Sequence, residues 1–173
     1  AIYYNCSQPI SHQNKQRKLI YITIGASGYV PLLKTAIKEL SDLDHELIIS
    51  TAGNRAGIGS LPSGVTVSDF VDSNKVLSEA ALFIFNGSAL SIYQAVATKT
   101  PMIAVPKNIS QSYYSNLIEE LRIGKRIDPY HLKPGALREA AKEVLFNVGY
   151  QARMPIFNKV NSTQKVLDVV RSI

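Results

Sequence analysis

Apolar runs of strand length alternate along this chain with segments whose apolar residues recur at helical spacing. The run at residues 18–25, Lys-Leu-Ile-Tyr-Ile-Thr-Ile-Gly, is rich in β-branched residues and ends at a glycine, which predicts a buried strand. Residues 29–40 then place Val30, Leu33 and Ile37 on one helical face. The alternation continues, with further strands expected at 45–51, 65–71, 82–85, 102–105 and 125–127, and helices at 76–80, 89–97, 110–121, 135–146 and 150–173.

Strands that alternate with helices indicate a parallel sheet, because parallel neighbours need a crossover between them. We therefore expect an α/β domain with a Rossmann-like, doubly wound parallel sheet of about six strands and helices on both faces. Residues 1–17 are polar and aperiodic, and are interpreted as a linker from a preceding domain. Residues 18–149 form the expected domain and 150–173 its helical tail, so the chain is expected to be a piece of a longer protein.

Composition narrows the classes of function. The net charge of +6 attracts anions, but the basic residues are scattered rather than gathered in a stripe with aromatics, so nucleic-acid binding is not expected. Cys6 is the single cysteine, which rules out an internal disulfide. No acidic or histidine cluster has metal-ligand spacing, so no metal is expected. Without a signal peptide or a membrane-length apolar run, the expected location is the cytoplasm, with no transmembrane segment.

Ligands of open parallel sheets bind beyond the carboxyl ends of the strands, and small or polar residues follow several strands here. The turn Asn86-Gly87-Ser88 is the most informative. Its glycine lets backbone approach an anion closely, and the helix that follows begins with unpaired amides and a partial positive charge. Ser88 and Ser91 add hydroxyl groups, so the turn is a candidate diphosphate site. The commoner alternative is that Ser88 only caps the helix.

A dinucleotide cofactor is the main rival for such a fold. Its signature is G-x-G-x-x-G after the first strand with an acid at the end of the second. This chain has Gly25-Ala26-Ser27-Gly28 at the first position and Thr51-Ala52-Gly53 at the second. Nicotinamide and flavin are therefore not expected, and no cofactor is predicted.

Between residues 61 and 124 the order of motifs resembles the donor-binding, carboxyl-terminal domain of UDP-glycosyltransferases, most of all the plant, macrolide and sterol enzymes of the GT-B fold. A weaker similarity extends from residue 19 to about 146. The motifs that carry the resemblance are Leu61-Pro62 with Val65-Thr66-Val67, Phe70-Val71-Asp72-Ser73, the run from Asn86 to Ala95, Thr100-Pro101-Met102-Ile103-Ala104-Val105-Pro106, Ser110-Gln111, and Leu121-Arg122-Ile123-Gly124.

The resemblance implies the donor-binding half of an inverting glycosyltransferase that transfers a sugar to an acceptor hydroxyl. The ligand would be a nucleotide-sugar, UDP-linked or TDP-linked. The general base would lie in an amino-terminal, acceptor-binding domain of the same polypeptide, so no catalytic residue is expected in this chain and the chain alone should be inactive. The implied donor-binding residues are Gly25, Ser27, Phe70, Ser73, Asn86, Gly87, Ser88, Ser91, Gln94, Ser110 and Gln111.

Four positions depart from the family's polar signature. Asn86 stands for the histidine that contacts the diphosphate, Gln94 for the ribose-binding glutamate, Ser73 for the glutamine that faces the base, and Ser110 for the sugar-binding aspartate. Asn86 can donate a hydrogen bond but carries no charge. Phe70 replaces a tryptophan that stacks on the base, or else belongs to the core. Two alternatives therefore stay open, a nucleotide-sugar epimerase of the same architecture and a noncatalytic binding domain.

Overall fold

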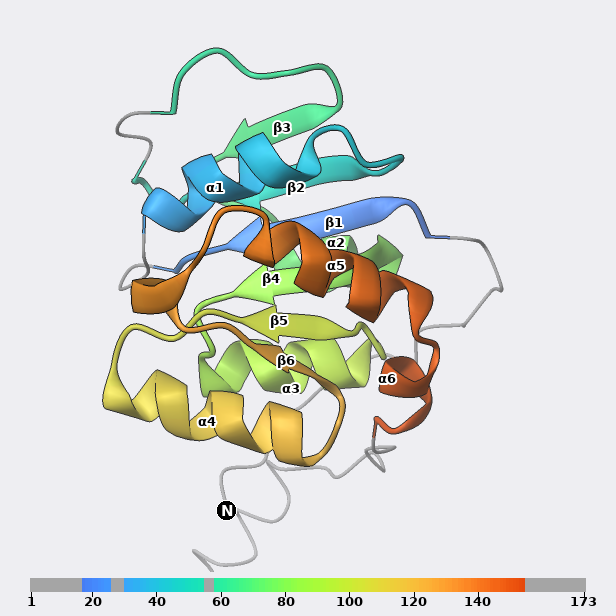
Figure 1. Cartoon of the computed structure of the whole chain (residues 1–173). Coiled ribbons are helices and arrows are strands. Elements are labelled where there is room, and N and C mark those ends of the chain that lie inside the picture. Colours follow the sequence, from blue (N-terminus) through green and yellow to red (C-terminus); the bar gives the residue numbers. More distant parts are fainter. Residues whose placement is uncertain (1–16, 26–29, 55–57, 155–173) are drawn as a thin grey trace, which may run out of the picture.

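A six-stranded, all-parallel sheet forms the centre of the molecule (Figure 1). The computed structural model describes residues 17–25, 30–54 and 58–154. The strand order is β3-β2-β1-β4-β5-β6, which is the doubly wound order. The chain adds β2 and β3 on one side of β1 and then β4, β5 and β6 on the other side. The predicted fold class is confirmed. The strands are β1 (Leu19–Thr23), β2 (Glu46–Ser50), β3 (Val65–Ser68), β4 (Ala80–Phe85), β5 (Met102–Ala104) and β6 (Gly124–Arg126).

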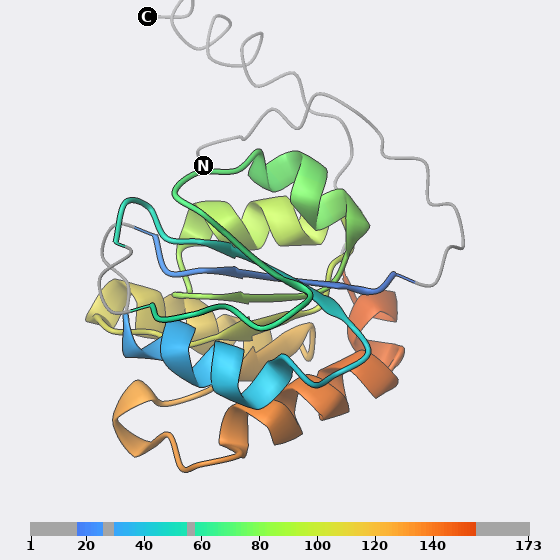
Figure 2. The ribbon, with the colours of Figure 1, turned by 90° about the horizontal axis from the view of Figure 1, so that it is seen from above.

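Helices cover both faces of the sheet, with α2 and α3 on one side and α1 and α5 on the other (Figure 2). Successive residues of a strand point to opposite faces, so the core has two layers. Ile20, Ile22 and Ile24 face α1 and α5, whereas Tyr21 and Phe83 stack in the other layer with their ring centroids 5.1 Å apart. The helices are α1 (Pro31–Leu40), α2 (Ser73–Glu79), α3 (Ala89–Ala97), α4 (Ile109–Glu120), α5 (Ala136–Phe146) and α6 (Gly149–Ala152), with a 3-10 turn at Pro129–His131.

Several boundaries differ from the sequence prediction, and at two of them the structure shows hydrogen bonds at the changed end. Helix α2 begins three residues earlier than expected, because the Asp72 carboxylate accepts hydrogen bonds from the amides of Asn74 and Lys75 and caps it. Strand β3 ends at Ser68 instead of residue 71, and the Asp69 carbonyl beyond it accepts a hydrogen bond from the Ala52 amide. Both contacts place polar groups at the carboxyl edge of the sheet.

Helices α1 and α5 contact each other on the face of the sheet that they cover. The Glu39 carboxylate accepts hydrogen bonds from the amides of Gly135 (2.7 Å) and Arg138 (3.2 Å), which are at the start of α5. The Arg138 guanidinium in turn makes two 2.7 Å bonds to the carboxylate of Asp42. This ion pair lowers the pKa of Asp42, first through the hydrogen bond to Arg138. Helix α5 therefore has a fixed position across the sheet.

The ends of the chain lie mostly outside the described residues. Of the predicted linker at 1–17 only Arg17 is described, and its guanidinium donates a 3.0 Å hydrogen bond to the Ala80 carbonyl. The helix predicted at 150–173 does not run on through the described residues, because α6 ends at Ala152 and Arg153 is its C-cap. The described residues end at Met154, which is buried against the layer that contains Phe83. Within the described part of the chain, no helix has the length and apolar character needed to cross a bilayer.

Candidate functional site

Asn86 follows β4 directly and lies beside the end of β1, the two neighbouring strands between which the order of the sheet changes. This side chain is buried, donates a 2.9 Å hydrogen bond to the Ile24 carbonyl at the end of β1, and accepts one from the Ser88 amide at 3.2 Å. Gly25 has a φ of +57°, and a Cβ there would lie 3.0 Å from the Asn86 amide nitrogen. Asn86 therefore connects the ends of β1 and β4 by a hydrogen bond. At most one hydrogen of its side-chain amide is left for a ligand.

Gly87 serves the packing of α4. Its φ is +80°, and an added Cβ would lie 2.4 Å from the Ser115 hydroxyl and 3.0 Å from the Gln111 carbonyl. The sequence interpretation explained this glycine by the approach of an anion. The structure adds a further reason, because the space that a side chain would fill is occupied by α4.

The start of α3 presents backbone donors. Ser88 occupies the N-cap position with extended backbone (φ −69°, ψ 140°), but its side chain makes no capping bond and its hydroxyl donates to that of Ser91 at 2.7 Å. The alternative that Ser88 is a side-chain cap is therefore wrong. Within the residues that the structure describes, the amides of Ala89, Leu90 and Ser91 make no hydrogen bond. These donors and the helix dipole together favour an anion.

Helix α2 borders α3 on the same face of the sheet. The Gln94 amide nitrogen donates a 3.1 Å hydrogen bond to the side-chain oxygen of Asn74, which fixes the orientation of the Gln94 amide. The Ser73 hydroxyl lies 3.0 Å from the Tyr21 hydroxyl at the centre of the sheet, and burial raises the pKa of Tyr21. Ser73 is thus already engaged with the protein, while Gln94 keeps its carbonyl oxygen as an acceptor.

Phe70 lies on the surface beyond β3, with 77% of its side chain exposed, so it does not belong to the core. The preceding residue is anchored, because the Asp69 carboxylate accepts a 2.8 Å hydrogen bond from the Thr51 hydroxyl. An exposed aromatic ring next to a fixed backbone can act as a stacking platform for a planar ligand.

Gln111 braces the loop before α4. Its side chain is buried, and its carbonyl oxygen accepts a 2.8 Å hydrogen bond from the Lys107 amide. The backbone amide of Gln111 donates a 2.9 Å hydrogen bond to the side-chain oxygen of Asn108, which is the N-cap of α4. Ser110 is exposed beside them. The sequence interpretation missed Asn108, although an asparagine followed three residues later by a glutamine is a known sign of a helix start.

The predicted site residues do share one edge of the sheet. The contacts above join Gly25 to Asn86, Asn86 to Ser88, Ser88 to Ser91 and Gly87 to Gln111. Phe70 and Ser110 lie at the same carboxyl edge, whereas Ser27 lies outside the described residues. Among the described residues, no three histidine, cysteine or acidic side chains are placed to hold a metal ion. Besides Asn108, the sequence interpretation missed Asp69, Asn74 and Ser115.

Known proteins resemble the chain in both sequence and fold. Residues 34–170 match the family model described as "Erythromycin biosynthesis protein CIII-like, C-terminal domain". A PGL/p-HBAD biosynthesis glycosyltransferase of Mycobacterium tuberculosis (strain ATCC 25177 / H37Ra) is 30% identical over 129 residues, which are 75% of this chain and 30% of the relative. The chain thus spans less than a third of the length of that relative.

Solved structures share the fold at lower identity. The glycotransferase of kitacinnamycin superimposes with a TM-score of 0.72 at 24% identity, over 79% of this chain and 37% of the other. Glycosyltransferase VinC, solved in complex with DTDP, gives a TM-score of 0.74 at 19% identity, over 92% of this chain and 42% of the other. The chain has the α/β fold of the carboxyl-terminal halves of GT-B glycosyltransferases, and it belongs to the family of erythromycin biosynthesis protein CIII-like C-terminal domains.

Proposed function

We propose that this chain binds the nucleotide-sugar donor of a glycosyltransferase and holds its diphosphate at the amino terminus of α3. The proposal depends mainly on the backbone amides of Ala89, Leu90 and Ser91, which have no side-chain cap. They lie at the start of α3, after β4, where the order of strands in the sheet changes side. Two findings support it. The relative described above is named a glycosyltransferase, and VinC, which has the same fold, was solved with a nucleoside diphosphate.

In this proposal the base stacks on Phe70 and the Gln94 carbonyl oxygen accepts a hydrogen bond from a hydroxyl of the nucleoside sugar. The hydroxyls of Ser88 and Ser91 lie beside the diphosphate. The remaining predicted residues line the site or lie near the transferred sugar. They are Gly25, Ser27, Ser73, Asn86, Gly87, Ser110 and Gln111.

The proposed reaction breaks the bond between the anomeric carbon and the diphosphate oxygen while an acceptor hydroxyl attacks the opposite face of the sugar, which inverts its configuration. Negative charge grows on the leaving diphosphate as that bond breaks. Oriented amides at a helix start stabilise such charge without reorganising. This chain therefore supplies leaving-group stabilisation, and the general base that takes the proton of the acceptor belongs to another domain.

The proposed division of the chain follows from these roles. Residues 18–149 form the donor-binding domain, 1–17 link it to an amino-terminal acceptor-binding domain, and 150–173 are its helical tail. The chain alone is expected to bind the donor without transferring sugar.

Calorimetric titration with TDP, UDP and GDP, and with the three corresponding monophosphates, tests the proposal. Each additional charge-assisted hydrogen bond is worth about 1.5–3 kcal/mol, so we expect at least one diphosphate to bind about tenfold or more tightly than its monophosphate. Comparison of the three diphosphates then identifies the nucleoside that the site prefers. If none of the three diphosphates binds at concentrations on the order of millimolar, the proposal is wrong.

A further inference from the structure

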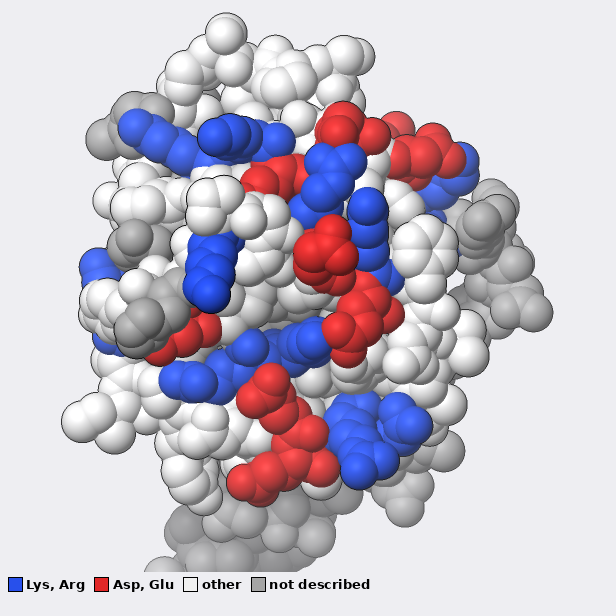
Figure 3. All heavy atoms as spheres, viewed as in Figure 1, with Lys and Arg blue, Asp and Glu red and all other residues white. Residues whose placement is uncertain are grey.

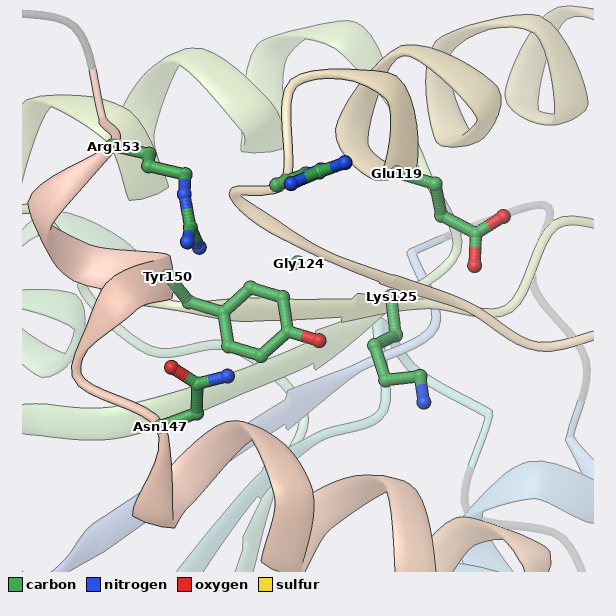
Figure 4. A pocket seen from close by; sticks show the side chains of 7 residues that line it. Glu119, Gly124, Lys125, Asn147, Tyr150 and Arg153 are labelled. Carbon is green, nitrogen blue, oxygen red and sulfur yellow. The ribbon is translucent and has the colours of Figure 1, made fainter.

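A second polar cleft lies at the opposite edge of the sheet from the candidate donor site. It encloses about 350 Å³ where α4 ends, β6 begins and α5 ends, which is the side of the amino ends of the strands. Its walls include the side chains of Arg122, Lys125, Asn147, Tyr150 and Arg153. In the view of Figure 4 the ring of Tyr150 lies between the labelled side chains of Arg153 and Asn147. Nothing in the donor-site proposal uses this cleft.

The acidic groups around the cleft are already engaged. Glu143 forms an ion pair with Lys125 and accepts a 2.8 Å hydrogen bond from the Tyr150 hydroxyl. The Glu119 carboxylate accepts a 3.1 Å hydrogen bond from the Arg126 amide.

The two arginines are not neutralised in this way. Within the part of the chain that the structure describes, Arg122 and Arg153 form no ion pair. On the face drawn in Figure 3, Lys and Arg atoms form a compact group at the lower right, close to where Figure 1 shows α6. Apart from the Lys125–Glu143 pair, the cleft is lined by two guanidinium groups and one carboxylate, that of Glu119, so it has one positive charge in excess. Guanidinium groups are well suited to bind phosphate.

The Arg153 side chain lies across the backbone of α6. A Cβ added at Gly149 would lie 2.8 Å from a terminal nitrogen of the Arg153 guanidinium and 3.2 Å from its central carbon. The side-chain oxygen Oδ1 of Asn147 accepts a 3.0 Å hydrogen bond from the backbone amide of Gly149, which leaves the side-chain nitrogen of Asn147 to donate. Asn147 therefore adds one side-chain amide donor to the cleft, beside the guanidinium group of Arg153.

The backbone at Arg122 is in the left-handed region, with a φ of +53°. The Arg122 amide donates to the Glu119 carbonyl and the Ile123 amide donates to the Ile118 carbonyl, which is the pattern that ends helices with a glycine at this position. An arginine here has a conformational cost that glycine would avoid. A strained residue that contributes a side chain to a cleft points to a role for that side chain.

We propose that this cleft binds a phosphate group, with the guanidinium groups of Arg122 and Arg153 and the side-chain amide of Asn147 as donors. A cleft of about 350 Å³ leaves room for an organic group attached to the phosphate, so we expect the ligand to be a phosphate ester. The ester is either a soluble metabolite or the headgroup of a phospholipid. Phe146 and Val148, which flank Asn147 in the sequence, are more than four-fifths exposed beside this edge.

NMR titration of the ¹⁵N-labelled full chain with glycerol 3-phosphate, at ionic strength held constant with sodium chloride, tests the proposal. Saturable shifts are expected at the amides of Gly124, Gly149 and Tyr150. Changing Arg122→Gly together with Arg153→Gln should weaken binding about tenfold or more. The matched control, Lys34→Gln with Lys75→Gln, removes two exposed lysines from α1 and α2 and should leave the affinity unchanged.

The single change Arg122→Gly separates binding from folding. It should raise the midpoint of thermal unfolding, because glycine prefers this backbone conformation, and yet weaken phosphate binding.

Co-sedimentation with phosphatidylcholine vesicles, with or without phosphatidylglycerol, distinguishes the two sources. Binding to the anionic vesicles alone identifies a lipid headgroup, and saturable shifts with glycerol 3-phosphate alone identify a soluble ester. The proposal is overturned if neither ligand binds, or if the lysine control loses as much affinity as the arginine variant.

Discussion

Replacing Gly87 with alanine should lower the free energy of unfolding by about 2–4 kcal/mol and abolish nucleotide binding. Two costs add at this position. The φ of +80° disfavours any residue with a Cβ, and that Cβ would lie 2.4 Å from the Ser115 hydroxyl and 3.0 Å from the Gln111 carbonyl. The second contact is with helix backbone and is relieved only if α4 moves. Since typical domains are stable by about 5–15 kcal/mol, the loss is a large fraction of the total.

Gly64→Ala is the matched control for this change. Gly64 has nearly the same φ, +79°, but a Cβ there meets nothing within 4 Å. Only the conformational cost of about 1–2 kcal/mol applies. Urea unfolding followed by circular dichroism measures both variants. Equal stabilities for the two would show that α4 does not press on the turn at Gly87, contrary to the packing described above.

Replacing Phe70 with alanine should weaken the binding of TDP or UDP by roughly 5- to 150-fold, since stacking on an aromatic side chain is worth about 1–3 kcal/mol per base. The free energy of unfolding should stay within about 0.5 kcal/mol of the original value, because the side chain is 77% exposed and leaves no cavity. The combination of lost affinity and unchanged stability distinguishes a ligand contact from a structural one. Calorimetric titration and urea unfolding give the two numbers.

Phe146→Ala is the control for Phe70. Phe146 is 83% exposed at the end of α5, at the opposite edge of the sheet, so the same atoms are removed far from the proposed base. Its replacement should leave nucleotide affinity unchanged. Equal affinities for the two variants would remove Phe70 from the proposed site.

The fold could be predicted from the sequence because its signals are local. Helix α3 has the bounds that the sequence predicts, since the glycine and serine before it and the Thr98–Pro101 segment after it limit it on both sides. Helix α2 begins earlier than its apolar pattern predicts, because the Asp72 cap adds a polar first turn before Val76, although a capping residue is also a local signal. The end of β3 depends on hydrogen bonds to the chain after β2, which the sequence does not show.

The sequence predicts which candidate residues gather at the carboxyl edge of the sheet, but it does not predict what each of them contacts. The order of strands and turns placed the candidates at one edge of the sheet. Asn86 bonds to Ile24 only because β4 lies beside β1, a neighbour 62 residues away in the chain. Gly87 is required by Ser115 and Gln111 supports Lys107, contacts that exist only once α4 has packed. Local motifs therefore predicted which residues gather, and tertiary packing decides what each one contacts.

The central claim is that backbone amides at the start of α3 bind the diphosphate, and Ala89→Pro tests it most directly. Proline is tolerated as the first residue of a helix and removes only the amide hydrogen, and the extended backbone of Ser88 suits a following proline. Ile109→Pro makes the same change at the first residue of α4. The decisive measurement is the dissociation constant for TDP by calorimetry. We expect a rise of about 10- to 150-fold for Ala89→Pro, the loss of one charge-assisted hydrogen bond, and no change for Ile109→Pro. An unchanged constant in a folded Ala89→Pro variant would contradict the account.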